Sequence, residues 1–294
     1  MKNKLPSLVY VAALAVAIVT ASCSSNEDTP VTNEPNTESY KVSSRQVGVT
    51  GEDNMRDLGG FVGENNKRVL YRKLYRSGEL SALTSVDKDT LAKRGINQVI
   101  DLRTESERNE KADKVLNGVV NYQLPLITDT PGASASSQAD FMGQIIQGKI
   151  NAMDFMLPIY TEIDALKETN WEKIFDLLET GNVTLYHCTA GKDRAGMTTA
   201  LVLSSLGVDK ATIIKDFMSS NDYLHTANQA TVDQINTAYH AQGMGEKLLP
   251  LLGVEQIYIT SFFDAIDAKY GSMDNFLTKL KVDQAKMKSL YLEK

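Results

Sequence analysis

The chain has 294 residues, of which 42% are hydrophobic and 7% aromatic, and this composition excludes a disordered protein and a small scaffold held together by disulfides. Its 37 acidic residues outnumber its 31 basic residues, so a chain-wide basic surface is absent and we expect no nucleic-acid partner. Two cysteines exclude a disulfide-rich fold, and three histidines disfavour a histidine-based metal site; we expect neither a metal nor a cofactor.

The first 22 residues are organised like a secretory signal peptide. Lys2 and Lys4 precede an unbroken apolar run over residues 8–19, which is shorter than the roughly 20 residues of a membrane-spanning helix. The run ends in Thr20-Ala21-Ser22-Cys23, which resembles the lipobox of bacterial lipoproteins. The resemblance implies cleavage before Cys23 and attachment of lipid to it, although Thr20 replaces the usual aliphatic residue. An ordinary signal peptide with an incidental cysteine is the alternative.

Residues 23–44 are predicted to be a flexible tether between the lipid and a globular body. They are rich in Ser, Thr, Asn, Glu and Pro and contain too few apolar side chains to form a core. A lipid on Cys23 would anchor the protein to the membrane of a bacterial cell envelope, outside the cytoplasm, at the outer membrane or the cell surface. Asn26-Glu27-Asp28 resembles an acidic surface-export signal, although solvation alone also explains acidic residues in a linker.

The body, residues 45–294, has strand and helix patterns and no internal repeat. Its first half predicts short strands at Val69–Tyr71 and Leu74–Tyr75, a helix over Asp87–Arg94 capped by Ser85 or Asp87 and stopped by Gly95, and a buried strand over Ile96–Leu102. Its second half predicts a helix over Trp171–Glu179, a strand over Val183–Tyr186, a helix over Ala195–Leu206 stopped by Gly207, a helix capped by Asp209, and three helices from Ser261 onward.

The strand, loop and helix around residue 188 predict the fold class. Such a βα unit belongs to an α/β fold with a mostly parallel sheet flanked by helices, here with an added helical C-terminal part. Parallel sheets bind ligands at the carboxyl ends of their strands, so we expect a reactive loop after the strand at Val183–Tyr186.

The loop from His187 to Gly196 carries the residues expected to react. The N-terminus of the following helix and successive backbone N–H groups favour an anion, and hence the thiolate form of Cys188. Gly191 permits the tight turn that directs these N–H groups inward. Arg194, six residues after Cys188, has a planar guanidinium that can bind two phosphate oxygens. The loop therefore predicts transfer of a phosphoryl group to Cys188, followed by hydrolysis of the phosphocysteine.

The segment from His187 to Arg194 resembles the HC-x-AGKDR loop of the bacterial tyrosine-protein phosphatase family, within the protein tyrosine phosphatase superfamily. Three upstream segments are similar to further motifs of that family: Asn54–Gly60, Leu74–Leu80 and Val99–Glu107. The resemblance covers about residues 45–294 and implies one catalytic domain with the cysteine-based phosphatase fold. It implies hydrolysis of phosphotyrosine, with phosphoinositide monoesters as a further substrate class, so the partner would be a phosphorylated protein or phospholipid.

The resemblance also assigns roles beside the nucleophile. His187 would hold the loop and tune the thiol, and Asp193 would be the general acid that protonates the leaving oxygen. The substrate phosphate would be bound by Thr189, Ala190, Gly191, Lys192 and Asp101. Lys192 suits a substrate with more than one phosphate, or it simply balances the charge of Asp193.

Two other carboxylates are alternative general acids. Asp101 ends its strand at the same edge of the sheet, and Asp129 lies in a Gly/Ser/Pro-rich stretch, Thr128–Ser137, that would close as a lid. Any of the three could instead be structural. Arg56, Asp57 and Arg76 are expected to form an ion-pair scaffold. The apolar cluster within residues 225–254 would be a lid, a membrane-facing patch or, most commonly, ordinary core.

Two other functions are compatible with a reactive loop cysteine or with the same fold. A catalytically weak module that binds phosphorylated ligands would share the fold, but its mark would be loss of Cys188 or Arg194, and both are present. A rhodanese or arsenate reductase shares the loop cysteine but leaves Gly191–Arg194 unexplained. Ala195 stands where the family usually has Thr or Ser, so a hydroxyl that would bond the Cys188 sulfur is missing.

Overall fold

The computed structural model describes residues 45–114, 116–129 and 135–294. The predicted signal peptide and tether lie outside these residues, as do residues 130–134 of the predicted lid. In the part of the chain that is described, no helix is long and apolar enough to cross a membrane.

A five-stranded sheet lies at the centre of the fold, with the strand order β1-β2-β5-β3-β4. β1 (Arg56–Asp57) is antiparallel to β2 (Leu74–Ser77). The remaining pairs, which join β2, β5 (Thr184–His187), β3 (Gln98–Asp101) and β4 (Val120–Gln123), are all parallel. The predicted α/β fold with a mostly parallel sheet is therefore confirmed.

The helices, in chain order, are η1 (Glu64–Asn66), α2 (Ser85–Lys93), α3 (Glu105–Glu110), α4 (Ala135–Ile146), α5 (Ala152–Thr161), η2 (Ile163–Ala165), α6 (Glu168–Leu178), α7 (Arg194–Ser205), α8 (Lys210–Met218), α9 (Ser220–Tyr223), α10 (His225–Ala238), η3 (Gly245–Leu248), α11 (Leu249–Leu252), α12 (Gln256–Tyr270), α13 (Met273–Lys279) and α14 (Gln284–Tyr291).

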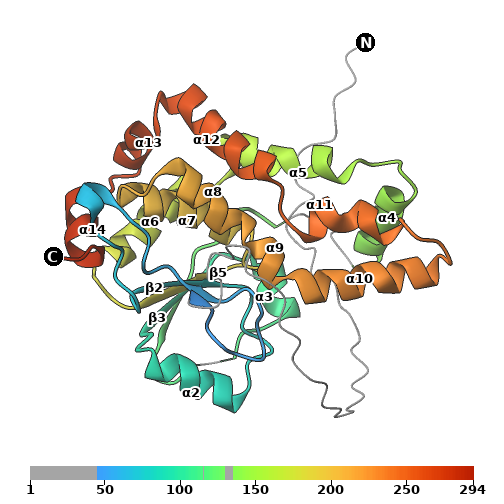
Figure 1. Ribbon diagram of the computed structural model, residues 1–294, viewed down its shortest axis with the longest axis horizontal. Helices are drawn as coiled ribbons and strands as arrows, with labels where there is room; N and C mark the ends of the chain where they lie inside the picture. Colours follow the sequence, from blue (N-terminus) through green and yellow to red (C-terminus); the bar gives the residue numbers. More distant parts are fainter. Residues whose placement is uncertain (1–44, 115, 130–134) are drawn as a thin grey trace, which may run out of the picture.

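Alternating apolar residues give the sheet two buried faces. Val99 and Leu185 join a core on the side of α2, and Ile100 and Tyr186 join a larger core on the other side. Figure 1 shows α2 on one side of the sheet and α6, α7 and α8 on the other. Successive side chains of a strand point to opposite faces, so the two apolar residues in the middle of β3 and of β5 enter different cores, whereas the residues at the ends of both strands are polar and also buried.

The predicted elements on both sides of residue 188 are present with small shifts of their ends. α6, β5 and α7 match the expected helix, strand and helix, and Gly207 follows α7 with a φ of +77°, which only glycine adopts readily. Asp209 caps α8 by accepting a hydrogen bond from the Thr212 amide at 2.9 Å. The three C-terminal helices are also present, but the first of them, α12, begins at Gln256 rather than near Ser261.

Two local predictions were wrong. Thr84, and neither Ser85 nor Asp87, is the N-cap of α2: Thr84 and Asp87 form a reciprocal capping box, in which Asp87 occupies the third helical position. Val69 makes only an isolated bridge with Leu292, so Val69–Tyr71 is not a strand. The apolar cluster over residues 248–252 agrees with the commonest of its interpretations, ordinary core: Leu248 and Leu251 are buried core residues, while Leu249 is 40% exposed.

Candidate active site

Cys188 lies at the carboxyl end of β5, and the loop that follows it ends where α7 begins at Arg194. The Cys188 side chain belongs to the core and is 1% exposed. Gly191 has a φ of +69°, and a Cβ at this position would lie 2.5 Å from the nitrogen of Gly78. The turn therefore requires glycine both for its backbone conformation and for its close approach to β2.

Arg76 of β2 supports the reactive loop through hydrogen bonds to the loop backbone. Its guanidinium donates to the carbonyl oxygens of Gly191 at 2.7 Å and Lys192 at 3.1 Å, and it forms an ion pair with Asp216 at 2.9 Å. Arg56 pairs with the other oxygen of Asp216 at 3.1 Å, and all three side chains are buried. Because both carbonyls point toward Arg76, the amides of this turn are free to face a bound anion.

The predicted scaffold is thus partly correct. Arg56 and Arg76 do share a carboxylate, but it belongs to Asp216, which lies 140 residues beyond Arg76. Asp57 instead accepts hydrogen bonds from the backbone amides of Gly59 and Arg72, each at 2.8 Å. It holds the turn after β1 and takes no part in the ion pair.

A second brace holds the first half of the loop. The side-chain amide of Asn54 donates to the Ala190 carbonyl at 2.8 Å, and the backbone amide of Glu79 donates to the Thr189 carbonyl at 3.0 Å. Both bracing residues lie in segments that the sequence analysis matched to family motifs, 54–60 and 74–80. The shared function of those distant segments is to fix the conformation of the loop.

Arg194 is held in place by Glu107 of α3. Its two terminal nitrogens donate to the two carboxylate oxygens of Glu107 at 2.7 Å each, and Glu107 also accepts a hydrogen bond from the Thr189 hydroxyl. Burial works against the charged forms, but the pair lowers the pKa of Glu107 and raises that of Arg194. The sequence pattern predicts no role for Glu107, although this residue ends the matched segment 99–107.

Asp193 lies beside Arg194 and accepts hydrogen bonds from two donors. One is the phenol of Tyr160 on α5, and the other is the ammonium of Lys192, at 3.2 Å. The Lys192 ammonium also donates to the Gly253 carbonyl at 2.9 Å, and the residue is 5% exposed. Lys192 is therefore bonded within the protein and does not project from the mouth of the site.

The loop geometry agrees with the comparisons to known proteins. A model described as "Tyrosine phosphatase family" matches residues 47–293. The chain belongs to this family.

Three curated relatives extend the comparison. A protein of Cupriavidus necator named as a tyrosine-protein phosphatase is 30% identical over 251 residues, covering 81% of this chain and 85% of its own. The "Triple specificity protein phosphatase PtpB" of Mycobacterium tuberculosis is 28% identical over 240 residues, covering 72% and 87%. A tyrosine-protein phosphatase of Nostoc commune is 26% identical over 227 residues, covering 73% and 71%.

The two alternative acids of this family member occupy different settings. Asp101 is held by Arg103, whose Nε and terminal nitrogen donate to its two oxygens at 3.0 and 2.8 Å. Asp129 is exposed and accepts hydrogen bonds from the amide and hydroxyl of Ser106, at the start of the helix that carries Glu107. Asp101 is committed to Arg103, whereas Asp193 and Asp129 both retain solvent access.

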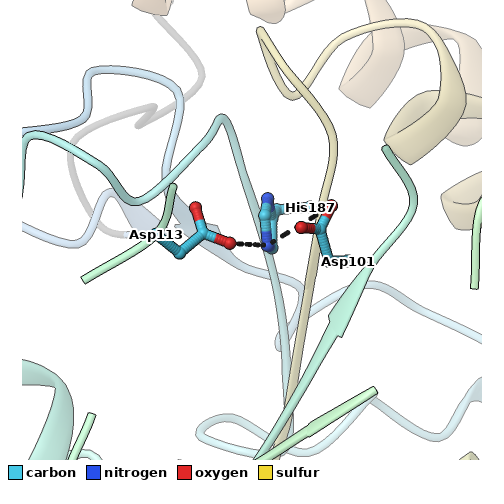
Figure 2. Close-up of side chains that lie close together, drawn as sticks. All are labelled: Asp101, Asp113 and His187. Atoms are coloured by element: carbon cyan, nitrogen blue, oxygen red, sulfur yellow. Dashed lines mark ion pairs between the residues drawn. The ribbon is translucent and has the colours of Figure 1, made fainter. Parts of the chain in front are cut away.

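His187, the residue before the nucleophile, lies between two carboxylates (Figure 2). Its Nε2 is 3.1 Å from Asp113 and 3.9 Å from Asp101, in ion-pair contacts rather than aligned hydrogen bonds. The ligand atoms of the three residues lie within 4.8 Å of one another, a spacing compatible with a metal ion. However, the guanidinium of Arg103 lies 2.8 Å from both carboxylates, so positive charge is already supplied there.

Proposed function

We propose that this protein is a cysteine-dependent phosphatase that hydrolyses phosphotyrosine through a phosphocysteine intermediate on Cys188. The observation that carries the proposal is the placement of a cysteine at the end of a parallel strand, inside a braced loop that ends at an arginine held by Glu107. Membership of the tyrosine phosphatase family supports the substrate class.

The reaction follows from the loop. The Cys188 thiolate attacks phosphorus, the bond from phosphorus to the tyrosine oxygen breaks, and the leaving phenolate takes a proton from a general acid, which we assign to Asp193. The guanidinium of Arg194 and the loop amides hold the phosphoryl oxygens during the transfer. Water then attacks phosphorus and gives a proton to the Asp193 carboxylate, the bond to sulfur breaks, and inorganic phosphate and the Cys188 thiolate are released.

We extend the proposal to phosphoinositide monoesters and to an anchored location. The Mycobacterium tuberculosis relative carries the name of a triple-specificity phosphatase, which favours a substrate range wider than phosphotyrosine. A lipid on Cys23 would place the site outside the cytoplasm, so its substrate would be a foreign phosphoprotein, a phospholipid head group or a scavenged phosphoester. Membrane fractionation of the wild type and Cys23→Ser tests the anchor. If the anchor exists, the wild type is found in the membrane fraction and the variant is not.

The catalytic proposal is tested with p-nitrophenyl phosphate, a phosphotyrosine peptide and phosphoinositide vesicles. Cys188→Ser should abolish phosphate release from all three while still binding vanadate, because the loop and Arg194 remain. Arg194→Lys should lose orders of magnitude in activity, since an ammonium cannot make the two-point contact of a guanidinium. Near-normal turnover in either variant contradicts the mechanism, and binding without turnover in the wild type identifies a phospho-ligand-binding module.

A further inference from the structure

Asp113 lies outside the reactive loop and outside every matched motif, yet it contacts the residue that precedes the nucleophile. Its Oδ2 is 3.1 Å from Nε2 of His187 and 2.8 Å from a terminal nitrogen of Arg103. Its Oδ1 accepts a hydrogen bond from the Leu80 amide at 2.7 Å. Two contacts that do not involve His187 therefore fix the position of this carboxylate.

Both ring nitrogens of His187 face oxygen acceptors. Nδ1 lies 3.3 Å from the Cys188 carbonyl oxygen, and Nε2 faces the carboxylates of Asp113 and Asp101. A neutral imidazole has one nitrogen that donates and one that only accepts, so one nitrogen would face an oxygen without a proton between them. The imidazolium form has a proton on each nitrogen, one facing the Cys188 carbonyl oxygen and one facing the carboxylates.

The balance of charge favours the same form. His187 and Arg103 are buried together with Asp101, while Asp113 is the partly exposed fourth member of the cluster. An imidazolium gives two positive and two negative groups, whereas a neutral ring leaves one negative charge without a partner, which is costly in a buried site. Burial works against the charged ring, but Asp101 and Asp113 outweigh it and raise the pKa of His187. Contacts with His187 and Arg103 outweigh burial and lower the pKa of Asp113 below its usual range.

We propose that Asp113 is a positioning residue that holds His187 as an imidazolium beside Cys188, and thereby sets the pH range in which the nucleophile is a thiolate. The inference rests on the proposed role of Cys188. The ring is joined to Cys188 through the peptide bond and contacts its carbonyl, so its charge adds to that of the α7 N-terminus in favouring the thiolate.

Asp113, rather than Asp101, is the group through which this effect can be tested. Arg103 contacts both carboxylates at 2.8 Å, but Asp101 is 3.9 Å from His187, whereas Asp113 is 0.8 Å closer, at 3.1 Å. Both carboxylates line a polar pocket of about 580 Å³, but the Asp113 side chain is 21% exposed and that of Asp101 only 7%. The charge of Asp113 can therefore be removed without opening the core.

The first test is an NMR titration of the histidine side chains. The chain has three histidines, so the His187 resonance is identified by its loss in His187→Asn. In the wild type it should titrate above the ordinary value of about 6.5, and in Asp113→Asn the midpoint should fall by about one pH unit or more, as expected for loss of an opposite charge at this distance. Asp113→Glu should restore most of the shift.

The second test measures alkylation of Cys188 by iodoacetate as a function of pH, read by mass spectrometry of the peptide that contains it. The midpoint should move to higher pH in Asp113→Asn and return toward the wild type in Asp113→Glu. Glu110→Gln is the matched control, because it removes an exposed carboxylate from the nearby end of α3 and should leave both midpoints unchanged.

Several results would overturn the inference. They are equal His187 midpoints in the wild type and Asp113→Asn, a wild-type His187 that is neutral at pH 6.5, and a His187 shift with no change in Cys188 alkylation. If Asp113→Asn does not fold, the wild-type titration and Asp113→Glu decide the question. Both measurements work without a substrate, so a protein that releases no phosphate contradicts the proposed function while the titration still tests Asp113.

Discussion

Glu107 and Arg194 face each other as two planar groups, joined by parallel hydrogen bonds of 2.7 Å from the two terminal nitrogens of the guanidinium. The same carboxylate accepts a hydrogen bond from the backbone amide of Thr104 at 2.9 Å, which closes the capping box of α3. One side chain thus starts a short helix and orients the arginine of the loop. The start of α3 and the orientation of Arg194 therefore depend on the same side chain, Glu107.

Glu107→Gln should impair both activity and stability. The amide keeps the shape but loses the negative charge, and one of its two terminal groups cannot accept from Arg194. Loss of a hydrogen bond to a charged group costs about 1.5–3 kcal/mol, which predicts a fall in kcat/KM of about ten- to a hundredfold. Steady-state kinetics and urea unfolding measure the two effects. Glu105→Gln, an exposed change in the same helix, should behave like the wild type.

Asp193→Asn should show whether Asp193 or Asp129 is the general acid. If Asp193 protonates the leaving oxygen, the variant loses about 10²–10⁴ in turnover of phenyl phosphate and much less with p-nitrophenyl phosphate, whose leaving group needs little protonation. Asp129→Asn should leave the ratio of the two rates unchanged. The reverse pattern would assign the acid to Asp129, in which case the Tyr160 and Lys192 contacts of Asp193 only hold the loop.

The sequence predicted those parts of the site that are local in the chain. Cys188, Gly191 and Arg194 are within seven residues of one another, and the strand and helix beside them have clear apolar patterns. Pattern reading cannot reveal which carboxylate meets an arginine across 87 residues, as Glu107 meets Arg194. For the same reason Asp113 was missed, and Asp216 was missed in favour of Asp57, which lies next to Arg56 in the chain.

Local ambiguity accounts for other differences. Thr84, Ser85 and Asp87 are all residue types that cap helices well. Composition alone therefore does not show which of them is the N-cap. In the structure, Thr84 and Asp87 occupy the two positions of a capping box. The role of Lys192 is ambiguous in the same way, because its place in the loop is compatible with a substrate contact or with a structural contact. The Gly253 carbonyl that it binds lies 61 residues away.

Lys192→Met should act mainly on stability. The methionine keeps the apolar stem but leaves the buried Gly253 carbonyl without its donor, at a cost of about 1–3 kcal/mol. Urea unfolding should show this loss. Activity toward phosphoinositide vesicles and toward p-nitrophenyl phosphate should change by the same factor. A selective loss for the substrate with several phosphates would instead show that Lys192 leaves Gly253 to bind it.

Acid should unfold the protein partly through Asp216. Burial opposes its ionisation, but Arg56 and Arg76 hold the pKa of this carboxyl well below its usual range. A pKa lower in the folded state than in the unfolded state contributes stability that is fully present above about pH 4, the ordinary value for aspartate, and is lost as the pH falls below it. Asp216→Asn should therefore lower the unfolding free energy by about 3–5 kcal/mol at pH 7, because two buried arginines lose their shared partner. The difference from the wild type should shrink toward pH 2, and a constant difference would contradict this origin.

Ala195 is completely buried directly after Arg194, and two nearby threonine hydroxyls donate to other oxygens. Thr189 donates to Glu107, and Thr199 donates to the Ala195 carbonyl at 2.7 Å. Thr198 accepts a hydrogen bond from the indole of Trp171 at 3.1 Å. Thr189 and Thr199 therefore give their hydroxyl protons to other oxygens, and Ala195 has no hydroxyl that could bond the Cys188 sulfur when it leaves phosphorus.

Hydrolysis of the phosphocysteine should therefore limit turnover. A hydrogen bond to a charged sulfur contributes about 1.5–3 kcal/mol, so its absence slows this step by about ten- to a hundredfold relative to a threonine-bearing relative. Stopped-flow measurements with p-nitrophenyl phosphate should show a burst of p-nitrophenol followed by a slow steady state. Ala195→Thr should remove the burst and raise the steady-state rate, with little effect on the first step, and Ala195→Ser should do the same with less crowding of the core. Ala195→Val matches threonine in shape without the hydroxyl and should keep the burst. A wild type without a burst, together with unchanged turnover in Ala195→Ser, would mean that another donor serves the sulfur or that the first step is rate-limiting.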